Sequence, residues 1–194
     1  LPLPDSPVCL AHSMLSTTGH GVQPFTEGDV SIAHNGQIYN YLEMNSKLGA
    51  KKSIAQKPLS SDSEVIARFF AKELSGKKKM DFAAVAKKFM RLARGEYAIG
   101  ALFRGELYAM RDFTGQKPLW FGESAELMAF ASEPGALRKI GIEFPVPLSP
   151  GHLLRAGKKG FETAKIFDWQ DFRKIVPRGH SIPMLKSAFD AAIE

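Results

Sequence analysis

The chain has 194 residues, of which 44% are hydrophobic, and a formal net charge of +6. This length and hydrophobic fraction allow one sizeable core, in one or at most two domains. A single cysteine excludes a disulfide scaffold and favours a reducing compartment. No uncharged apolar run approaches the roughly twenty residues of a membrane-spanning helix, and the first residues do not resemble a signal peptide. We therefore expect a cytoplasmic protein without a membrane partner.

The positive charge and a pI near 9.4 raise nucleic-acid binding as an alternative. The basic clusters lie in connections that contain Gly or Ser, and no aromatic residues alternate with them as stacking platforms would. These clusters are Lys51-Lys52, Lys77-Lys78-Lys79 and Lys158-Lys159. Solvated loops explain them, so we expect no nucleic-acid partner.

The first predicted elements are two short strands. Residues 7–12 are typical of a buried strand, in which Cys9 would be a structural, unreactive thiol. Residues 30–34 alternate as a strand does, and Asn35-Gly36 stands where this strand is expected to give way to a turn. Asn-Gly is the commonest hairpin turn, but an Asn amide beside a Gly N–H also provides two donors for one oxyanion. Both interpretations remain open from these residues alone.

Two helices are predicted from apolar residues at helical spacing. Their apolar faces are Val65, Ile66, Phe69, Phe70 and Leu74 in the first, and Phe82, Val85, Phe89 and Met90 in the second. Asp62 comes just before the first helix. It is either the N-cap of that helix or a carboxylate that binds a ligand, and it can have both roles.

The following region predicts antiparallel hairpins and one short helix. The expected strand pairs are residues 97–103 with 106–110, 119–121 with 127–131, and 152–155 with 163–167, and the helix covers residues 133–139 and ends at Gly141. Arg111-Asp112, with Gly115 and Lys117 after it, predicts a structured turn that contains a buried or half-buried ion pair.

The end of the chain predicts a linker and then a short amphipathic helix. No clear period is present from residue 169 to residue 183, whereas Leu185, Phe189 and Ala192 recur at helical spacing. Such a helix needs a surface to cover. We expect it to fray, to fold back over the sheets, or to pair with a second copy of the chain as a homodimer.

Several motifs occur here in the order that is typical of class II (N-terminal-nucleophile) glutamine amidotransferases, and over residues 8–157 the chain resembles that family. The motifs are His12 to Gly19, Gln23-Pro24-Phe25, Ala33 to Asn40, Ser61 to Ile66, Gly95 to Ala98, Tyr108 to Leu119 and Phe130 to Glu133. Asn-Gly-x-Ile-Tyr-Asn, Lys-Pro-Leu and the tail are most like asparagine synthetases. Ser-Thr-Thr-Gly and Gln-Pro-Phe are more like phosphoribosylpyrophosphate amidotransferases. The tail decides between them, so we expect the ammonia-supplying domain of an asparagine-synthetase-related protein, with a phosphoribosylpyrophosphate amidotransferase-like glutaminase as the alternative.

The resemblance implies an α+β fold, the four-layer αββα sandwich of antiparallel sheets, with its opening strand upstream of Leu1. It implies a type 2 glutamine amidotransferase domain over residues 1–168, and a linker and the start of a synthetase domain over residues 169–194. ATP and Mg²⁺ would belong only to that synthetase domain, so we expect no cofactor in this chain. We also expect no metal site, because the histidines lack paired ligand spacing.

For the reaction, the resemblance implies that an N-terminal cysteine attacks the glutamine carboxamide and that Asn35 and the Gly36 N–H hold the oxyanion. The ammonia would pass to the synthetase domain. The cysteine is expected upstream of Leu1, since Cys9 does not match its motif. A degenerate domain that binds a ligand or partner without catalysis is the alternative.

For glutamine binding, the resemblance implies contacts from Asp62, Gln37 and Thr17. Met14 stands where the family has an arginine that clamps the substrate carboxylate, and a thioether cannot replace a guanidinium. Gln37 stands where asparagine synthetases usually have Glu, which weakens a contact to the substrate ammonium.

Overall fold

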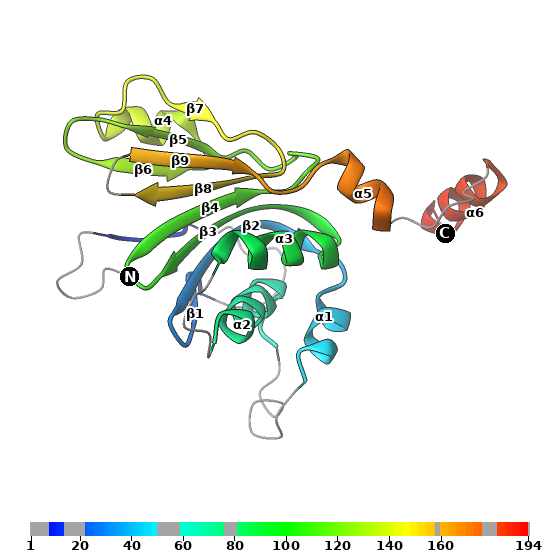
Figure 1. Ribbon diagram of the computed structural model, residues 1–194. Helices are drawn as coiled ribbons and strands as arrows, with labels where there is room; N and C mark the ends of the chain where they lie inside the picture. The colour runs from blue at the N-terminus through cyan, green and yellow to red at the C-terminus, as the bar shows by residue number, and fades with distance from the viewer. Residues whose placement is uncertain are drawn as a thin grey trace.

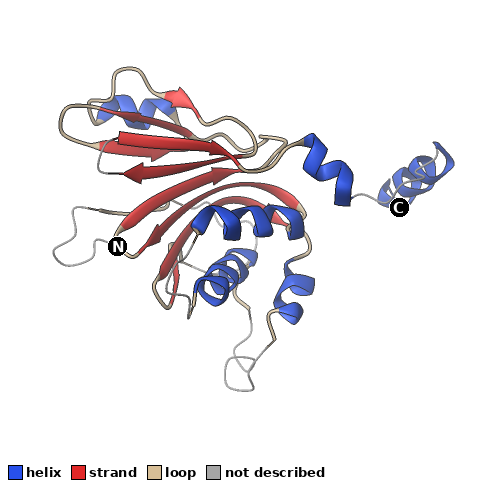
Figure 2. Cartoon of the chain, in the orientation of Figure 1, coloured by secondary structure: helices blue, strands red, loops and turns tan. Residues whose placement is uncertain are grey.

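The computed structural model describes residues 8–13, 22–49, 59–75, 81–157, 160–175 and 182–193 as an α+β structure with two antiparallel sheets (Figures 1 and 2). The larger sheet has the order β1 (Phe25–Glu27), β2 (Val30–Ile38), β3 (Gly95–Phe103), β4 (Glu106–Arg111), β8 (His152–Gly157) and β9 (Gly160–Lys165). The smaller sheet has the order β6 (Met128–Ala131), β5 (Trp120–Glu123) and β7 (Val146–Pro147). The helices are α1 (Tyr41–Lys47), α2 (Asp62–Leu74), α3 (Phe82–Leu92), α4 (Pro134–Lys139), α5 (Trp169–Ile175) and α6 (Ile182–Ile193).

The larger sheet is apolar on both faces, and this produces the layers. Alternate residues of a strand point to opposite faces. In β3, Ile99 packs in the cluster that contains Phe70 of α2 and Phe89 of α3, whereas the next residue towards the N-terminus, Ala98, packs with Leu119 near the smaller sheet. On the smaller sheet, α4 contacts β5 and β6. The expected α+β layered sandwich of antiparallel sheets is therefore confirmed.

The helices and hairpins predicted from periodicity are confirmed. The apolar face of α2 is buried throughout, and each fully buried Phe of this core contributes about 1.5–3 kcal/mol to folding. On α3, Phe82, Phe89 and Met90 are buried and Val85 is half-buried. The predicted strand pairs correspond to β3 with β4, β5 with β6, and β8 with β9.

Two predictions about the first strands are wrong. Cys9 is exposed rather than buried. Asn35-Gly36 does not end its strand, because β2 continues to Ile38 and pairs Gln37 with Glu96. The turn follows at residues 39–40 instead. Cross-strand pairing with β3 therefore overrides the local turn preference of Asn-Gly.

The predicted linker begins with a helix. Asp168 accepts hydrogen bonds from the N–H groups of Gln170 and Asp171, at 2.9 and 3.0 Å, which is how an N-cap starts a helix. The ring of Phe172 then stacks on Phe113, with ring centroids 4.8 Å apart. Phe113 also contacts the ring of Trp169, with centroids 5.1 Å apart. These two aromatic contacts and the cap stabilise α5, a combination that periodicity does not detect.

The tail forms the predicted helix, α6, and presents apolar residues to solvent. Ile182 is 84% exposed and Phe189 is 64% exposed. Figure 1 shows α6 apart from the two sheets. The domain boundary at residue 168 and the pairing of α6 with a second copy of the chain both stay predictions.

Asp112 holds the end of the β3–β4 pair with a buried carboxylate that is 1% exposed. Its Oδ1 accepts hydrogen bonds from the Thr114 N–H and the Gly115 N–H, both at 2.8 Å, and from the Thr114 hydroxyl. Its Oδ2 accepts one from the Tyr97 N–H at 3.1 Å. The carboxylate thus fixes both β3 and the turn after β4.

Arg111 does not pair with Asp112, so the predicted ion pair is wrong although the structured turn is confirmed. The guanidinium instead donates to the backbone carbonyls of Gly115, Lys117 and Leu148. Each charged side chain satisfies backbone groups of the turn. This turn carries Lys117 to the candidate site described below.

We expect Asp112→Ala to destabilise the fold by at least about 3 kcal/mol, because it leaves several buried donors without an acceptor. Urea unfolding measures the change. Asp29→Ala is the matched control: the Asp29 side chain is 68% exposed and contacts Arg104 at 3.5 Å, so its loss should change stability by less than about 1 kcal/mol. Similar losses for the two variants would contradict the proposed role of Asp112.

Candidate functional site

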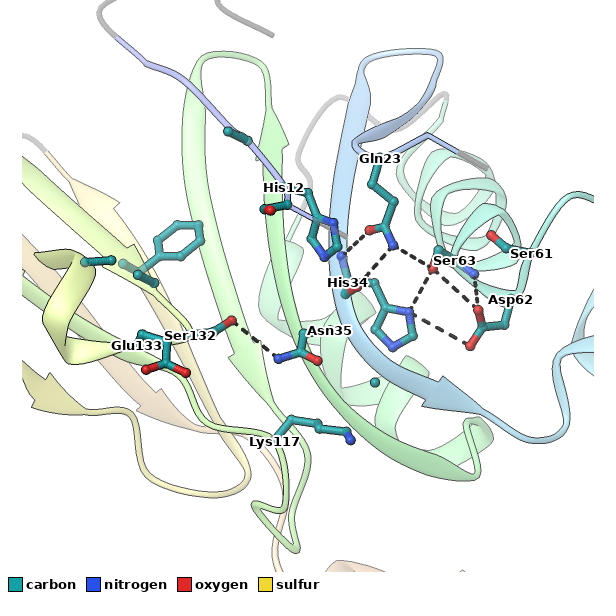
Figure 3. Close-up of a pocket in the computed structure, with 16 residues that line it drawn as sticks. His12, Gln23, His34, Asn35, Ser61, Asp62, Ser63, Lys117, Ser132 and Glu133 are labelled. Atoms are coloured by element: carbon teal, nitrogen blue, oxygen red, sulfur yellow. Dashed lines mark hydrogen bonds and ion pairs between the residues drawn. The ribbon is translucent and has the colours of Figure 1, made fainter. Parts of the chain in front are cut away.

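A polar pocket of about 810 Å³ lies where β2, the start of α2 and the segment after β6 meet (Figure 3). Several polar side chains line it, from segments far apart in the sequence. They are His12, Ser13, Gln23, His34, Asn35, Ser61, Asp62, Ser63, Lys117, Ser132 and Glu133, and Gly36 also lines the pocket.

The Gly36 N–H lies on an uncovered edge of β2. The N–H and C=O of Tyr97 both bond to Asp112, so they point towards β4. Because Tyr97 is the register partner of Gly36, the N–H and C=O of Gly36 point away from β3. On that side, β1 pairs with β2 only as far as Ile32.

Side chains replace the absent neighbouring strand on both sides of Gly36. The His34 N–H donates to Gln23 Oε1 at 2.6 Å, and the His34 C=O accepts from Gln23 Nε2 at 3.2 Å. Beyond Gly36, the Ile38 N–H donates to Asp62 Oδ2 at 2.8 Å. The Gly36 N–H thus stands between an amide and a carboxylate, in position to donate to a ligand.

Only glycine fits at position 36. Its φ is +142°, and a Cβ there would lie 2.0 Å from the backbone oxygen of Glu96. A side chain would force β2 away from β3. The close approach explains why glycine carries the donor that faces the pocket.

Asn35 projects from the face of β2 opposite to that of His34, towards the smaller sheet. Its Nδ2 lies 3.4 Å from the Ser132 hydroxyl (Figure 3). Asn35, Gly36 and Asp62 therefore all line one pocket, as the sequence predicts for oxyanion and ammonium contacts. Their roles towards glutamine stay predictions.

Asp62 is the first residue of α2 and not its N-cap, which is Ser61, so the capping interpretation is wrong. The Asp62 carboxylate accepts from the Ser63 N–H at 2.9 Å and bonds across to β2. Tertiary contact with the edge of β2 holds it at the pocket.

Of the other predicted substrate contacts, Gln37 alone is among the described residues. Its side chain is exposed, and Gln37 is not one of the described residues that line the pocket. Met14 and Thr17 lie outside the described residues.

Several residues that line the pocket were not predicted as site residues from the sequence. The main ones are His34, Gln23 and Lys117. His34 had a detectable signal: in β2 it shares a face with Ile32 and Ile38, both buried, so a polar residue stands on an apolar face. Gln23 and Lys117 had no such signal. Lys117 Nζ lies 3.1 Å from Glu96 Oε1.

His34 is neutral at pH 7. Burial lowers its pKa from 6.5 to about 4, and the positive charges of His12 and Lys117 act in the same direction. Asp62, whose Oδ2 lies 3.9 Å from Nδ1, opposes this shift. Burial also lowers the pKa of His12. The pocket therefore offers uncharged imidazole groups beside the carboxylates of Asp62 and Glu133.

Residues 11–139 match the sequence profile of a family described as the glutamine amidotransferase domain. This chain belongs to that family. Among curated relatives, the amidophosphoribosyltransferase of Methanocaldococcus jannaschii is 33% identical over 75% of this chain and 32% of the relative. That of Rhizobium etli is 33% identical over 78% of this chain and 31% of the relative. The chain spans about a third of the length of these relatives.

Solved structures of amidotransferases have the same fold. Glutamine phosphoribosylpyrophosphate amidotransferase from B. subtilis matches 80% of this chain and 34% of its own, with a TM-score of 0.65 and 23% identity. A glutamine aminotransferase class-II domain protein from Silicibacter pomeroyi matches 74% of this chain and 70% of its own, with a TM-score of 0.57 and 20% identity. These similarities confirm the predicted N-terminal-nucleophile hydrolase-like fold.

The described part of the chain has neither a metal-ligand cluster nor a membrane-spanning helix. No group of three His, Cys, Asp or Glu residues there is placed to hold a metal ion. Among the helices of that part, none has the length and apolar character that crossing a membrane requires.

We expect His34 to make stability depend on pH. The folded chain binds this proton more weakly than the unfolded chain, because the pKa of His34 falls from 6.5 to about 4 on folding. The resulting stability is full above about pH 6.5 and is lost as the pH falls towards 4. Between pH 7 and 4, urea unfolding should show wild type losing about 2–3 kcal/mol more than His34→Gln.

The matched control for this measurement is His152→Gln, since His152 lies outside the pocket and its Nδ1 bonds to the Pro150 oxygen at 2.9 Å. This variant should keep the pH dependence of wild type. If His34→Gln also keeps it, His34 is not buried in its neutral form.

Proposed function

We propose that this chain is the glutamine-binding and glutamine-hydrolysing domain of an amidotransferase related to the amidophosphoribosyltransferases. The observation that carries the proposal is the open Gly36 N–H, which stands between Gln23 and Asp62 in a polar pocket of a glutamine amidotransferase domain. The names of the relatives support this branch of the family. The likeness to asparagine synthetases rests on short motifs alone.

In the proposed complex, glutamine lies along the edge of β2. Its carboxamide oxygen accepts from the Gly36 N–H and from the Asn35 amide, and its ammonium group contacts Asp62. Two donors aimed at that oxygen stabilise the negative charge that develops when a nucleophile adds to the carbonyl. The pocket thus supplies binding and oxyanion stabilisation.

The chemical step requires a cysteine thiolate. It adds to the carboxamide carbon, ammonia leaves with a proton from the catalytic base, and water then hydrolyses the thioester to glutamate and free thiol. Cys9 does not line the pocket and is exposed, so it does not fit this role. The thiol would come from residues outside those that the structure describes.

Further parts of the proposal concern the longer protein. The ammonia would reach a domain C-terminal to this one, and the names of the relatives suggest a phosphoribosyl pyrophosphate as its acceptor. Any requirement for ATP or Mg²⁺ would belong to that domain. We also propose a cytoplasmic location.

The second candidate is a domain of the same family that binds an amino acid or amide without hydrolysing it. Two observations favour it. No cysteine is among the described residues that line the pocket, and Met14 occupies the place of the arginine that clamps the substrate carboxylate.

We expect the 194-residue chain to release no glutamate from glutamine, because its only cysteine lies outside the pocket. A coupled glutamate dehydrogenase assay measures the product, and addition of free glutamate is the positive control. Release that disappears in Cys9→Ser would identify Cys9 as the nucleophile and would contradict our placement of it.

We expect weak binding of L-glutamine that Met14→Arg strengthens. One charge-assisted contact changes affinity by about tenfold to a hundredfold. Asp62→Asn should weaken binding to a similar degree, because it removes the charge that faces the ammonium. Calorimetry measures the dissociation constants.

Met184→Arg is the matched control, since this methionine is 54% exposed on α6. It should leave binding unchanged. Micromolar binding by wild type would show that the arginine is not needed, and no binding even in Met14→Arg would refute the proposed function.

A further inference from the structure

Most buried side-chain polar atoms without a hydrogen bond lie at the pocket. Among the described residues these atoms are His12 Nδ1, His34 Nε2 and Ser61 Oγ, whose residues line the pocket, and Arg68 Nε, whose residue does not. An unsatisfied buried polar atom costs about 1–3 kcal/mol. Such a concentration at one place points to a polar ligand that completes these hydrogen bonds.

His34 is the most strongly fixed of the three. Its side chain is 1% exposed, and its backbone is clamped on both polar atoms by Gln23. Its Nδ1 lies 3.0 Å from the Ser63 hydroxyl (Figure 3). The ring therefore cannot turn to find another partner for Nε2 without breaking this contact.

The contacts around Ser63 limit where the imidazole proton of His34 can be. Gln23 Oε1 must accept from the His34 N–H, so Gln23 Nε2 is a donor, and it lies 3.3 Å from the Ser63 hydroxyl oxygen. The hydroxyl has a single proton, for which His34 Nδ1 at 3.0 Å and Asp62 Oδ1 at 3.5 Å are the two acceptors within reach. With the imidazole proton on Nδ1, the hydroxyl oxygen accepts from both Gln23 and His34 and the hydroxyl proton turns to Asp62.

The charge of Asp62 favours the imidazole proton on Nδ1. Its carboxylate lies 3.9 Å from Nδ1, where it stabilises an N–H and would repel a lone pair. Nε2 is left as a buried hydrogen-bond acceptor at the wall of the pocket. Its natural partner is an N–H donor of a ligand.

We propose that His34 is a specificity-determining residue that selects a primary carboxamide over a carboxylate. In β2, the Gly36 N–H donates to the oxygen of the ligand, and His34 Nε2 two residues away accepts from its amide N–H. A carboxylate has no hydrogen for Nε2 and would place two lone pairs against each other. This inference rests on the proposed function, because it explains how the site would bind glutamine and release glutamate.

The first experiment reads the state of His34 without any substrate. Nitrogen-15 spectra of histidine-labelled wild-type chain at pH 7 distinguish protonated from unprotonated ring nitrogens, and His34→Phe assigns the signals. We expect Nδ1 protonated and Nε2 unprotonated, and we expect the Nε2 signal to shift with acetamide but not with acetate. A proton on Nε2, or an equal response to both probes, would overturn the inference.

The second experiment measures selectivity by calorimetry with L-glutamine and L-glutamate. His34→Phe keeps a ring but removes the acceptor, and it should weaken glutamine binding about tenfold while leaving glutamate binding within about twofold. His152→Phe, outside the pocket, should leave both unchanged. An unaltered preference in a folded His34→Phe would refute the role of His34.

The two experiments separate the inference from the proposed function. If wild type binds neither amino acid but the Nε2 signal still distinguishes acetamide from acetate, the proposed function fails and the amide-selective role of His34 stands. If glutamine binds and His34→Phe keeps the preference, the proposed function stands and the inference fails.

Discussion

The register between β2 and β3 is the constraint on which the candidate site depends. Residues of an antiparallel pair alternate between bonding to each other and facing away. Tyr97 bonds to Asp112, so its partner Gly36 presents its N–H on the opposite edge. A slip of one residue would turn this N–H into the ladder and would exchange the two faces of β2. The tight approach of Gly36 to Glu96 holds the register at this position.

The edge of β2 shows how a sheet can be left open at one residue. Exposed polar groups on a strand edge pair readily with other chains, so proteins usually cover them. Here the amide of Gln23 covers His34 and the carboxylate of Asp62 covers Ile38. Only the polar groups of Gly36 remain between them. The same side chains that protect the edge also line the pocket, so stability and binding depend on the same contacts.

Family membership and site geometry answer different questions. The family match and the solved structures establish the fold and the type of domain. The geometry adds features of this chain: a neutral His34 held by Ser63, and Lys117 paired with Glu96 at the pocket. The pocket does not share the positive charge of the chain, because Asp62 and Glu133 line it together with Lys117.

The helices α2 and α3, the hairpins and the family were predictable from the sequence, because each depends on residues close together or on motifs in order. The apolar faces of α2 and α3 and the turn at Arg104-Gly105 are local patterns of this kind. Asn35, Gly36 and Asp62 were found as candidates through the motifs. Their convergence on one pocket agrees with that prediction.

The contacts between distant segments were not predictable from the sequence and are seen in the folded chain. Gln23 replaces a strand beside His34, Phe172 packs on Phe113 to hold a helix where a linker was predicted, and Arg111 bonds to carbonyls rather than to Asp112. In each case a side chain satisfies a group that the neighbouring sequence does not contain. Such pairings follow from which backbone groups the folded sheet leaves unsatisfied, and that is known only once the strands are in register.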